Sequence, residues 1–216
     1  MHLTELGVSV QPQNGIKLHY VVSGNAHDPL MLMVHGFPEC WYTWRHQILE
    51  FQKDYRVVAV DLRGYGDSDK PPNRTDYRAE NITEDLKLLI SGLGYNNCTL
   101  VAHDWGGVIA FMLAEQCPSS VNRLIVMNTT RRTIMFRLLV NHDPRQLLRL
   151  WYTFFFQCPY LPEAFLGWRD SRILKDMFRT ASGQAILSDD ELEAYKYYFS
   201  RPGSEDGTRT TERGEL

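Results

Sequence analysis

The chain has 216 residues, 44% of them hydrophobic and 23% charged, and carries a formal net charge of −3. This composition indicates a soluble globular domain with a substantial core. The small acidic net charge and the scattered basic residues argue against nucleic acid as a partner. The longest apolar runs, such as Leu30–Val34, are far too short to span a bilayer. The N-terminal segment lacks the basic start and apolar stretch of a signal peptide, so we expect a cytoplasmic protein.

The predicted elements alternate between buried strands and helices up to residue 128. An Asn14-Gly15 turn precedes a strand over residues 16–22, so the first two strands are expected to pair antiparallel. Further strands are predicted over residues 30–34, 56–61, 98–103 and 123–128, and helices over residues 41–51, 81–93 and 106–115. This order predicts an α/β fold with a parallel sheet and right-handed crossovers. Function in such sheets collects on the loops after the strands, and three polar loops follow Val34, Asp61 and His103.

The second part of the chain has a different pattern, rich in aromatic residues and without buried strands. Helices are predicted over residues 144–157, 163–168, 172–180 and 189–199, and Ser188 and Glu191 form a capping box before the last one. We therefore expect a core over residues 1–130, a helical lid over residues 131–203 and a disordered polar tail over residues 204–216.

The four cysteines predict free thiols rather than a disulfide or zinc framework, because they are widely spaced and form no Cys-x-x-Cys pair. They are Cys40, Cys98, Cys117 and Cys158. We expect neither a metal nor another cofactor.

The segment LVAHDWGG is typical of a nucleophile elbow, a sharp turn from a strand into a helix. Small residues are needed two positions before and after the nucleophile, and Ala102 and Gly106 stand there around Asp104, with Gly107 giving further room. An aspartate that only caps the next helix is an equally good interpretation of this segment alone.

The loop HGFPE favours the catalytic interpretation. It follows the strand that supplies the other half of an oxyanion hole in this kind of fold, which would consist of the backbone N–H groups of Phe37 and Trp105. His35, Gly36 and Pro38 are expected to support this loop. A simple strand-to-helix turn is the alternative, but two such loops at the right separation make it the weaker one.

Together, HGFPECWYTWRHQ, VVAVDLRGYGDSDKP and VAHDWGG resemble the epoxide hydrolases of the α/β-hydrolase fold. The similarity continues through WYTFFFQCPYLPE and LEAYKYYFSRPG, and it is greatest to the vertebrate-type group often described as membrane-anchored. The resemblance implies that a small apolar epoxide is hydrolysed to a diol through an ester on Asp104. The aromatic lid suggests lipid epoxides as substrates. Membrane association is left open by this resemblance.

The choice of aspartate suits this chemistry, because a carboxylate with a reference pKa of about 3.9 is already ionised at neutral pH. It can attack a saturated epoxide carbon and form an ester. The resemblance assigns the acid that protonates the ring oxygen to Tyr152, which is otherwise one more core aromatic. Phe37, Trp105 and Trp41 are expected to line an apolar pocket, although Trp41 also fits the core. His103 precedes the nucleophile on its strand, and we interpret it as structural.

Part of the expected machinery has no counterpart in this sequence. An elbow nucleophile is followed in the chain by an acid and then a histidine that activates water, yet the last histidine is His142. The second lid tyrosine and the final strands are also missing after residue 203. We therefore expect an incomplete α/β-hydrolase sheet in a C-terminally truncated chain, with an exposed apolar edge. Asp104 can still be alkylated, whereas hydrolysis of the ester is expected to fail.

Two alternatives remain. A haloalkane-type dehalogenase uses the same aspartyl ester, but those enzymes commonly place asparagine where this chain has Phe37, and the fluoroacetate type has arginine where it has Trp105. The other alternative is a non-catalytic truncated form that binds apolar ligands or competes with a full-length protein.

Overall fold

The computed structural model describes residues 5–10, 14–131, 133, 134, 137, 178, 179 and 182–199. Within them, six strands form one sheet in the order β1-β2-β4-β3-β5-β6. The strands are β1 (Glu5–Val10), β2 (Leu18–Ser23), β3 (Leu30–Val34), β4 (Arg56–Val60), β5 (Cys98–His103) and β6 (Val121–Met127). Strands β1 and β2 pair antiparallel, as do β2 and β4, and the remaining neighbours are parallel. The predicted α/β fold and the antiparallel first pair are confirmed.

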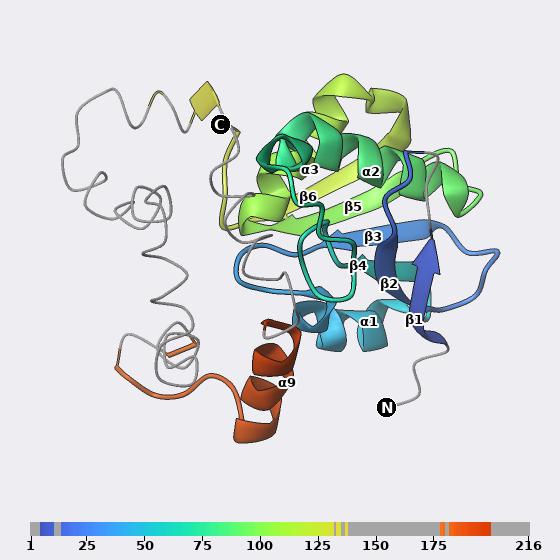
Figure 1. The fold of residues 1–216 in the computed structure, drawn as a ribbon. Helices are drawn as coiled ribbons and strands as arrows, with labels where there is room; N and C mark the ends of the chain where they lie inside the picture. The colour runs from blue at the N-terminus through green and yellow to red at the C-terminus, as the bar shows by residue number, and fades with distance from the viewer. Residues whose placement is uncertain are drawn as a thin grey trace.

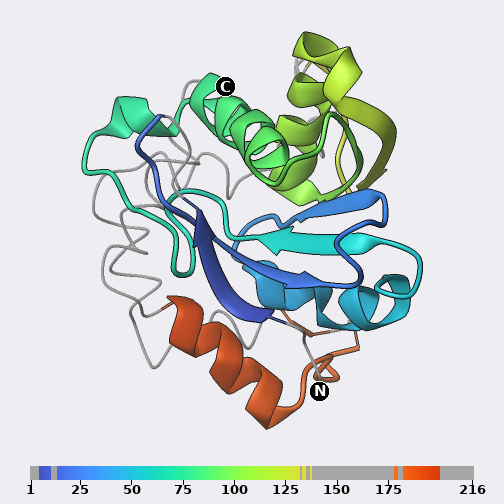
Figure 2. The same cartoon turned by 90° about the vertical axis from the view of Figure 1, so that its right-hand side faces the viewer.

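Helices lie on both faces of this sheet. Helices α2 (Ala79–Gly92) and α3 (Asp104–Gln116) cover one face, and α1 (Arg45–Phe51) and α9 (Asp189–Phe199) lie on the other (Figures 1 and 2). Three short 3₁₀ helices complete the described elements: η1 (Trp41–Trp44), η2 (Arg74–Tyr77) and η3 (Pro118–Ser120).

The single helix predicted over residues 41–51 is divided into η1 and α1, which corrects the prediction. Trp41 and Trp44 are both buried, and their spacing of three residues places them on one side of a 3₁₀ turn. The other boundaries differ from the predicted ones by a few residues, as with α3, which begins at Asp104.

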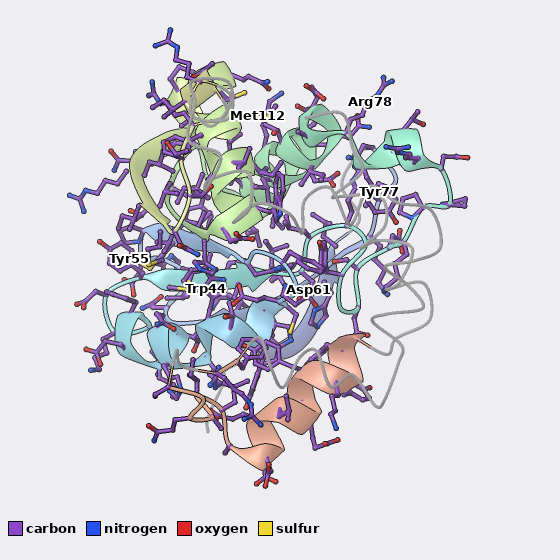
Figure 3. The ribbon with its side chains drawn as sticks, turned by 90° about the vertical axis from the view of Figure 1, so that its left-hand side faces the viewer. Trp44, Tyr55, Asp61, Tyr77, Arg78 and Met112 are labelled. Carbon is purple, nitrogen blue, oxygen red and sulfur yellow. The ribbon has the colours of Figure 1, made fainter. Side chains whose placement is uncertain are left out.

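The core has two layers because alternate residues of each buried strand point to opposite faces of the sheet. On β4, Val58 and Val60 belong to the layer under α2 and α3, whereas Val57 and Ala59 belong to the layer under α1. Trp44 packs into this second layer (Figure 3). Both faces of β3 and β4 are therefore covered, which explains why β3 is apolar throughout and β4 is apolar after Arg56.

Strand β6 is the outer strand of the sheet on the side of β5. Its apolar residues are partly open to solvent, with Ile125 exposed to 47% and Met127 to 40%. The sheet thus has the exposed apolar edge that the sequence predicts, within the described residues.

Of the four helices predicted for the lid, only the last lies within the described residues. Helix α9 has the predicted bounds. Its capping box is formed, since the Glu191 N–H donates to Ser188 Oγ at 3.3 Å and the Ser188 N–H donates to Glu191 Oε2 at 2.9 Å. The helices predicted over residues 144–157 and 163–168, and the tail over residues 204–216, lie outside the described residues. Of the helix predicted over residues 172–180, only Phe178 and Arg179 are described, and they form a turn and an isolated bridge to Ala185 rather than a helix. The division into core, lid and tail stays a prediction.

Candidate functional site

Asp104 lies at the junction of β5 and α3, with a backbone φ of 51°. A non-glycine residue in this left-handed region costs about 1–2 kcal/mol, and such strain is found where a turn presents a functional side chain. The turn is tight: a methyl group on Gly36 would lie 2.5 Å from Asp104 Cβ, and one on Gly106 would collide with the carbonyl oxygen of His35. The two glycines therefore allow the loop after β3 to lie against the elbow.

Two backbone N–H groups are directed at the Asp104 carboxylate. The N–H of Phe37 donates to Oδ1 at 3.2 Å, and the N–H of Trp105 donates to the same carboxylate. These are the two donors that the sequence predicts for an oxyanion hole. Burial raises the pKa of Asp104 above its usual range, and the two N–H groups oppose this shift by stabilising the ionised form.

Glu39 is a residue of this site to which the sequence analysis assigned no role. Its Oε2 accepts from the Gly36 N–H at 3.3 Å and from His103 Nδ1 at 3.1 Å, and its Oε1 accepts from Thr43 Oγ1 at 3.1 Å. Burial opposes the charge, but His103 and the other partners lower the pKa of Glu39, and the hydrogen bond to Glu39 raises the pKa of His103. The signal available in the sequence was the Glu39-to-Thr43 spacing of four residues.

His103 is therefore one half of a partly buried acid–histidine pair next to Asp104. Its side chain is 31% exposed, while that of Glu39 is 10% exposed. The structural role predicted for His103 stays a prediction, and the pair with Glu39 adds that its imidazole is joined to residues 35–39, called the oxyanion loop below.

The oxyanion loop is tied to the neighbouring loop by His35, which is completely buried. His35 Nδ1 donates to the Gly36 carbonyl at 2.8 Å, and Nε2 accepts from the Leu62 N–H at 3.1 Å. Burial lowers the pKa of His35, so the ring is neutral and can accept at Nε2. Pro38 is buried in the same loop.

Asp61, the residue after β4, is hydrogen-bonded to the segment that follows the oxyanion loop. It is fully buried, and its two oxygens accept from the Trp41 N–H at 2.8 Å and from His19 Nδ1 at 2.7 Å. Asp61 lies among the interior side chains in Figure 3. Because Trp41 begins η1, this carboxylate holds the segment after the oxyanion loop in place.

The other predicted site residues are placed as follows. Trp105 packs partly buried against the core layer that contains Phe37. Trp41 is 4% exposed and packs with Met31 and Met33, which favours the core alternative for this residue. Tyr152 lies outside the described residues. Cys40, Cys98 and Cys117 are free thiols.

The described residues contain neither a cluster of metal ligands nor a membrane-spanning helix. They contain no group of three or more histidine, cysteine, aspartate or glutamate side chains that could hold a metal ion. In the same part of the chain, every helix is too short or too polar to cross a membrane.

The comparisons with known proteins point to one family. A family model described as alpha/beta hydrolase fold matches residues 29–188. The chain is 43% identical over 200 residues to Epoxide hydrolase 4 of Homo sapiens, covering 90% of this chain and 55% of that protein. It is 44% identical over 201 residues to Epoxide hydrolase 3 of Mus musculus, covering 92% of this chain and 54% of that protein. The chain thus spans about half the length of these curated relatives.

Solved structures agree with the sequence matches. A mutant epoxide hydrolase from Bacillus megaterium, complexed with its naphthyloxy-propanediol product, superposes with a TM-score of 0.86 and is 33% identical. That comparison covers 95% of this chain and 71% of the other. An epoxide hydrolase from Vigna radiata gives a TM-score of 0.79 at 31% identity, over 96% of this chain and 70% of the other.

Proposed function

This chain belongs to the epoxide hydrolases of the α/β-hydrolase fold, and we propose that it opens a small apolar epoxide by attack of the Asp104 carboxylate. The observation that carries the proposal is the position of Asp104. Its carboxylate lies on a strained elbow and accepts N–H groups from both Phe37 and Trp105.

The bond changes of the proposed step balance without a co-reactant. A carboxylate oxygen of Asp104 attacks one epoxide carbon, a new ester C–O bond forms, and the ring C–O bond breaks. The ring oxygen leaves as an alkoxide and takes a proton, for which Tyr152 is the proposed donor because a phenol with a reference pKa of about 10 is a suitable weak acid. The whole epoxide is thereby added to the protein.

The oxyanion hole has its proposed role in the second step. When water attacks the ester carbonyl of Asp104, negative charge develops on the oxygen toward which Phe37 donates. This step needs a base to activate water, and the chain has no histidine after His142. We therefore propose that this chain forms the ester and hydrolyses it very slowly or not at all.

The product seen with the Bacillus megaterium relative suggests a probe, namely a naphthyl glycidyl ether. Wild-type protein incubated with this epoxide is expected to gain the mass of one whole epoxide, and peptide mapping is expected to place it on Asp104. Asp104→Asn should gain nothing, whereas Asp54→Asn, a change at an exposed carboxylate, should behave like wild type. An adduct elsewhere, or none, contradicts the first step. Diol production over many turnovers contradicts the proposed block in the second.

A further inference from the structure

Helix α9 is connected to the oxyanion loop through three side chains. The phenol of Tyr195, on α9, is hydrogen-bonded to the hydroxyl of Thr43. Thr43 Oγ1 in turn donates to Glu39 Oε1 at 3.1 Å. Glu39 Oε2 accepts from the Gly36 N–H at 3.3 Å and from His103 at 3.1 Å.

The direction of these hydrogen bonds follows from the protons available. The lowered pKa of Glu39 keeps it ionised and able only to accept, so the single proton of Thr43 is used toward it. Thr43 must then accept from Tyr195. Burial raises the pKa of Tyr195 to about 12, so its phenol keeps the proton that it donates. The hydrogen bonds therefore run from the Tyr195 O–H through the Thr43 O–H to the Glu39 carboxylate.

Both branches beyond Glu39 end next to the nucleophile. Gly36 precedes Phe37, whose N–H donates to Asp104 Oδ1 at 3.2 Å. His103 directly precedes Asp104 in the chain. A change in the orientation of the Glu39 carboxylate thus acts on the oxyanion loop and on the elbow together.

The position of α9 is set by packing near these hydrogen-bonded side chains. Tyr195 is 3% exposed and its ring lies edge-on to that of Tyr42, with centroids 5.8 Å apart. Tyr198 contacts Trp41 in the same way at 6.1 Å. Arg45 donates to Glu191 Oε1 at 3.0 and 2.6 Å. The Tyr195 phenol can reach Thr43 only while α9 is held in this place.

We propose that Thr43 and Tyr195 are positioning residues that couple the docking of α9 to the geometry of the oxyanion loop through the Glu39 carboxylate. This inference rests on the proposed function, because it gives the loop its catalytic meaning. Helix α9 falls within the region predicted as the lid. The contact therefore makes the position of the Phe37 N–H relative to Asp104 depend on where this helix lies.

The test compares variants that remove one hydroxyl at a time and keep the packing. Thr43→Val removes the central link, Thr43→Ser restores a hydroxyl, and Tyr195→Phe removes only the phenol oxygen. Matched controls are Thr75→Val, at an exposed threonine, and Tyr197→Phe, at a tyrosine of α9 that is 54% exposed. The two readouts are the rate of ester formation on Asp104 with a naphthyl glycidyl ether and the hydrogen exchange of the Gly36 and Phe37 amides.

Thr43→Val is expected to slow ester formation about tenfold and to speed exchange of both amides, because it removes a hydrogen bond to a charged group. Thr43→Ser should return both readouts toward wild type. Tyr195→Phe should shift both in the same direction by about threefold, since Thr43 still donates to Glu39. The double variant should be no worse than Thr43→Val alone, because the two hydroxyls act in one chain.

Wild-type exchange in Thr43→Val, absence of rescue by Thr43→Ser, or additive effects in the double variant would each overturn the coupling. If Thr43→Val does not fold, Tyr195→Phe against Tyr197→Phe decides the question alone, and equal exchange in those two proteins overturns it. If wild-type protein forms no ester, the proposed function is wrong, while the exchange measurement still tests the link between α9 and the loop.

Discussion

The backbone N–H of Phe37 donates to Oδ1 of Asp104 at 3.2 Å, so one oxygen of the proposed nucleophile already has a backbone donor. This contact occupies Oδ1 and leaves Oδ2 for the proposed attack on the epoxide. It also lies where charge would develop during hydrolysis of the proposed ester. The geometry therefore suits both steps of the proposed aspartyl-ester mechanism.

Asp104→Asn is expected to stabilise the protein at neutral pH. Burial raises the pKa of Asp104, so the folded state holds its proton to higher pH than the unfolded chain and loses stability as pH rises through this window. Asparagine removes that cost and tolerates a φ of 51° well. A gain of about 1 kcal/mol corresponds to a rise in Tm of about 2–4 °C for a chain of this size.

The stabilisation should disappear below about pH 4, where Asp104 is protonated in both states. Thermal unfolding at neutral and acidic pH measures this, with Asp54→Asn as the control at an exposed carboxylate. A gain in Tm that is the same at both pH values contradicts the explanation, because it could not come from the buried charge.

Gly106→Ala and Gly107→Ala are neighbours on α3 with different expected outcomes. A methyl group on Gly106 collides with the backbone oxygen of His35, which cannot move without displacing the oxyanion loop. A methyl group on Gly107 meets side-chain atoms of Thr129 and Val126.

We expect Gly106→Ala to lower the free energy of unfolding by about 3 kcal/mol or more. Gly107→Ala should change it by less, because helix propensity favours alanine over glycine by about 1 kcal/mol. Urea unfolding of the two variants provides the comparison. Equal losses, or a larger loss for Gly107→Ala, would show that the loop does not depend on the close approach at Gly106.

The elements could be predicted from the sequence because their signals are local. Apolar runs in β3 and β4 and the Ser188-to-Glu191 capping box each occupy a few consecutive residues, and the structure confirms them. The division of residues 41–51 was missed, because a 3₁₀ turn and an α-helix bury similarly spaced aromatic residues.

The site was predictable only in part. Asp104, Phe37 and Trp105 stand in short motifs whose spacing implies their contacts, and the structure brings these residues together. The pair of Glu39 with His103 joins residues 64 positions apart, and the contact of Thr43 with Tyr195 joins two regions of the fold. Such contacts depend on how α9 and the loops pack, which periodicity and motif spacing do not encode.

Glu39→Gln is expected to lower the pKa of His103, because the hydrogen bond to Glu39 is the main cause of its raised value. The stabilising contribution of a raised histidine pKa is fully present below the unfolded value of about 6.5 and is lost as pH rises through the folded value. Glu39 has a lowered pKa in the folded state, so its ionised form stabilises the protein above the unfolded-state pKa of about 4.3. This stabilisation is lost as pH falls through the folded-state pKa.

The stability difference between wild type and Glu39→Gln should therefore be greatest between about pH 4.3 and 6.5, at about 1–3 kcal/mol, and smaller at alkaline pH. NMR titration of His103 and urea unfolding at several pH values check this, with Glu50→Gln as the exposed control. An unchanged His103 titration in Glu39→Gln would contradict the pairing.

The ion pair between Arg45 and Glu191 is expected to hold α9 on the core in a pH-dependent way. The Ser188 backbone N–H and the Arg45 guanidinium lower the pKa of Glu191 to about 2. This contribution is present above the unfolded value of about 4.3 and is lost as pH falls toward the folded value. The two side chains are 11% and 25% exposed, so the pair is partly screened and a double-mutant cycle should give a coupling of about 0.5–1 kcal/mol.

The cycle uses Arg45→Met, Glu191→Gln and the double variant, with hydrogen exchange of the α9 amides as the measurement of docking. Exchange in both single variants should be faster than in wild type at neutral pH, and it should approach the wild-type rate as the solution is acidified. Glu193→Gln changes a carboxylate on the same helix whose side chain is 68% exposed, and it should leave exchange unchanged. Equal acceleration by Glu193→Gln would mean that net charge on α9, rather than its contact with Arg45, determines docking.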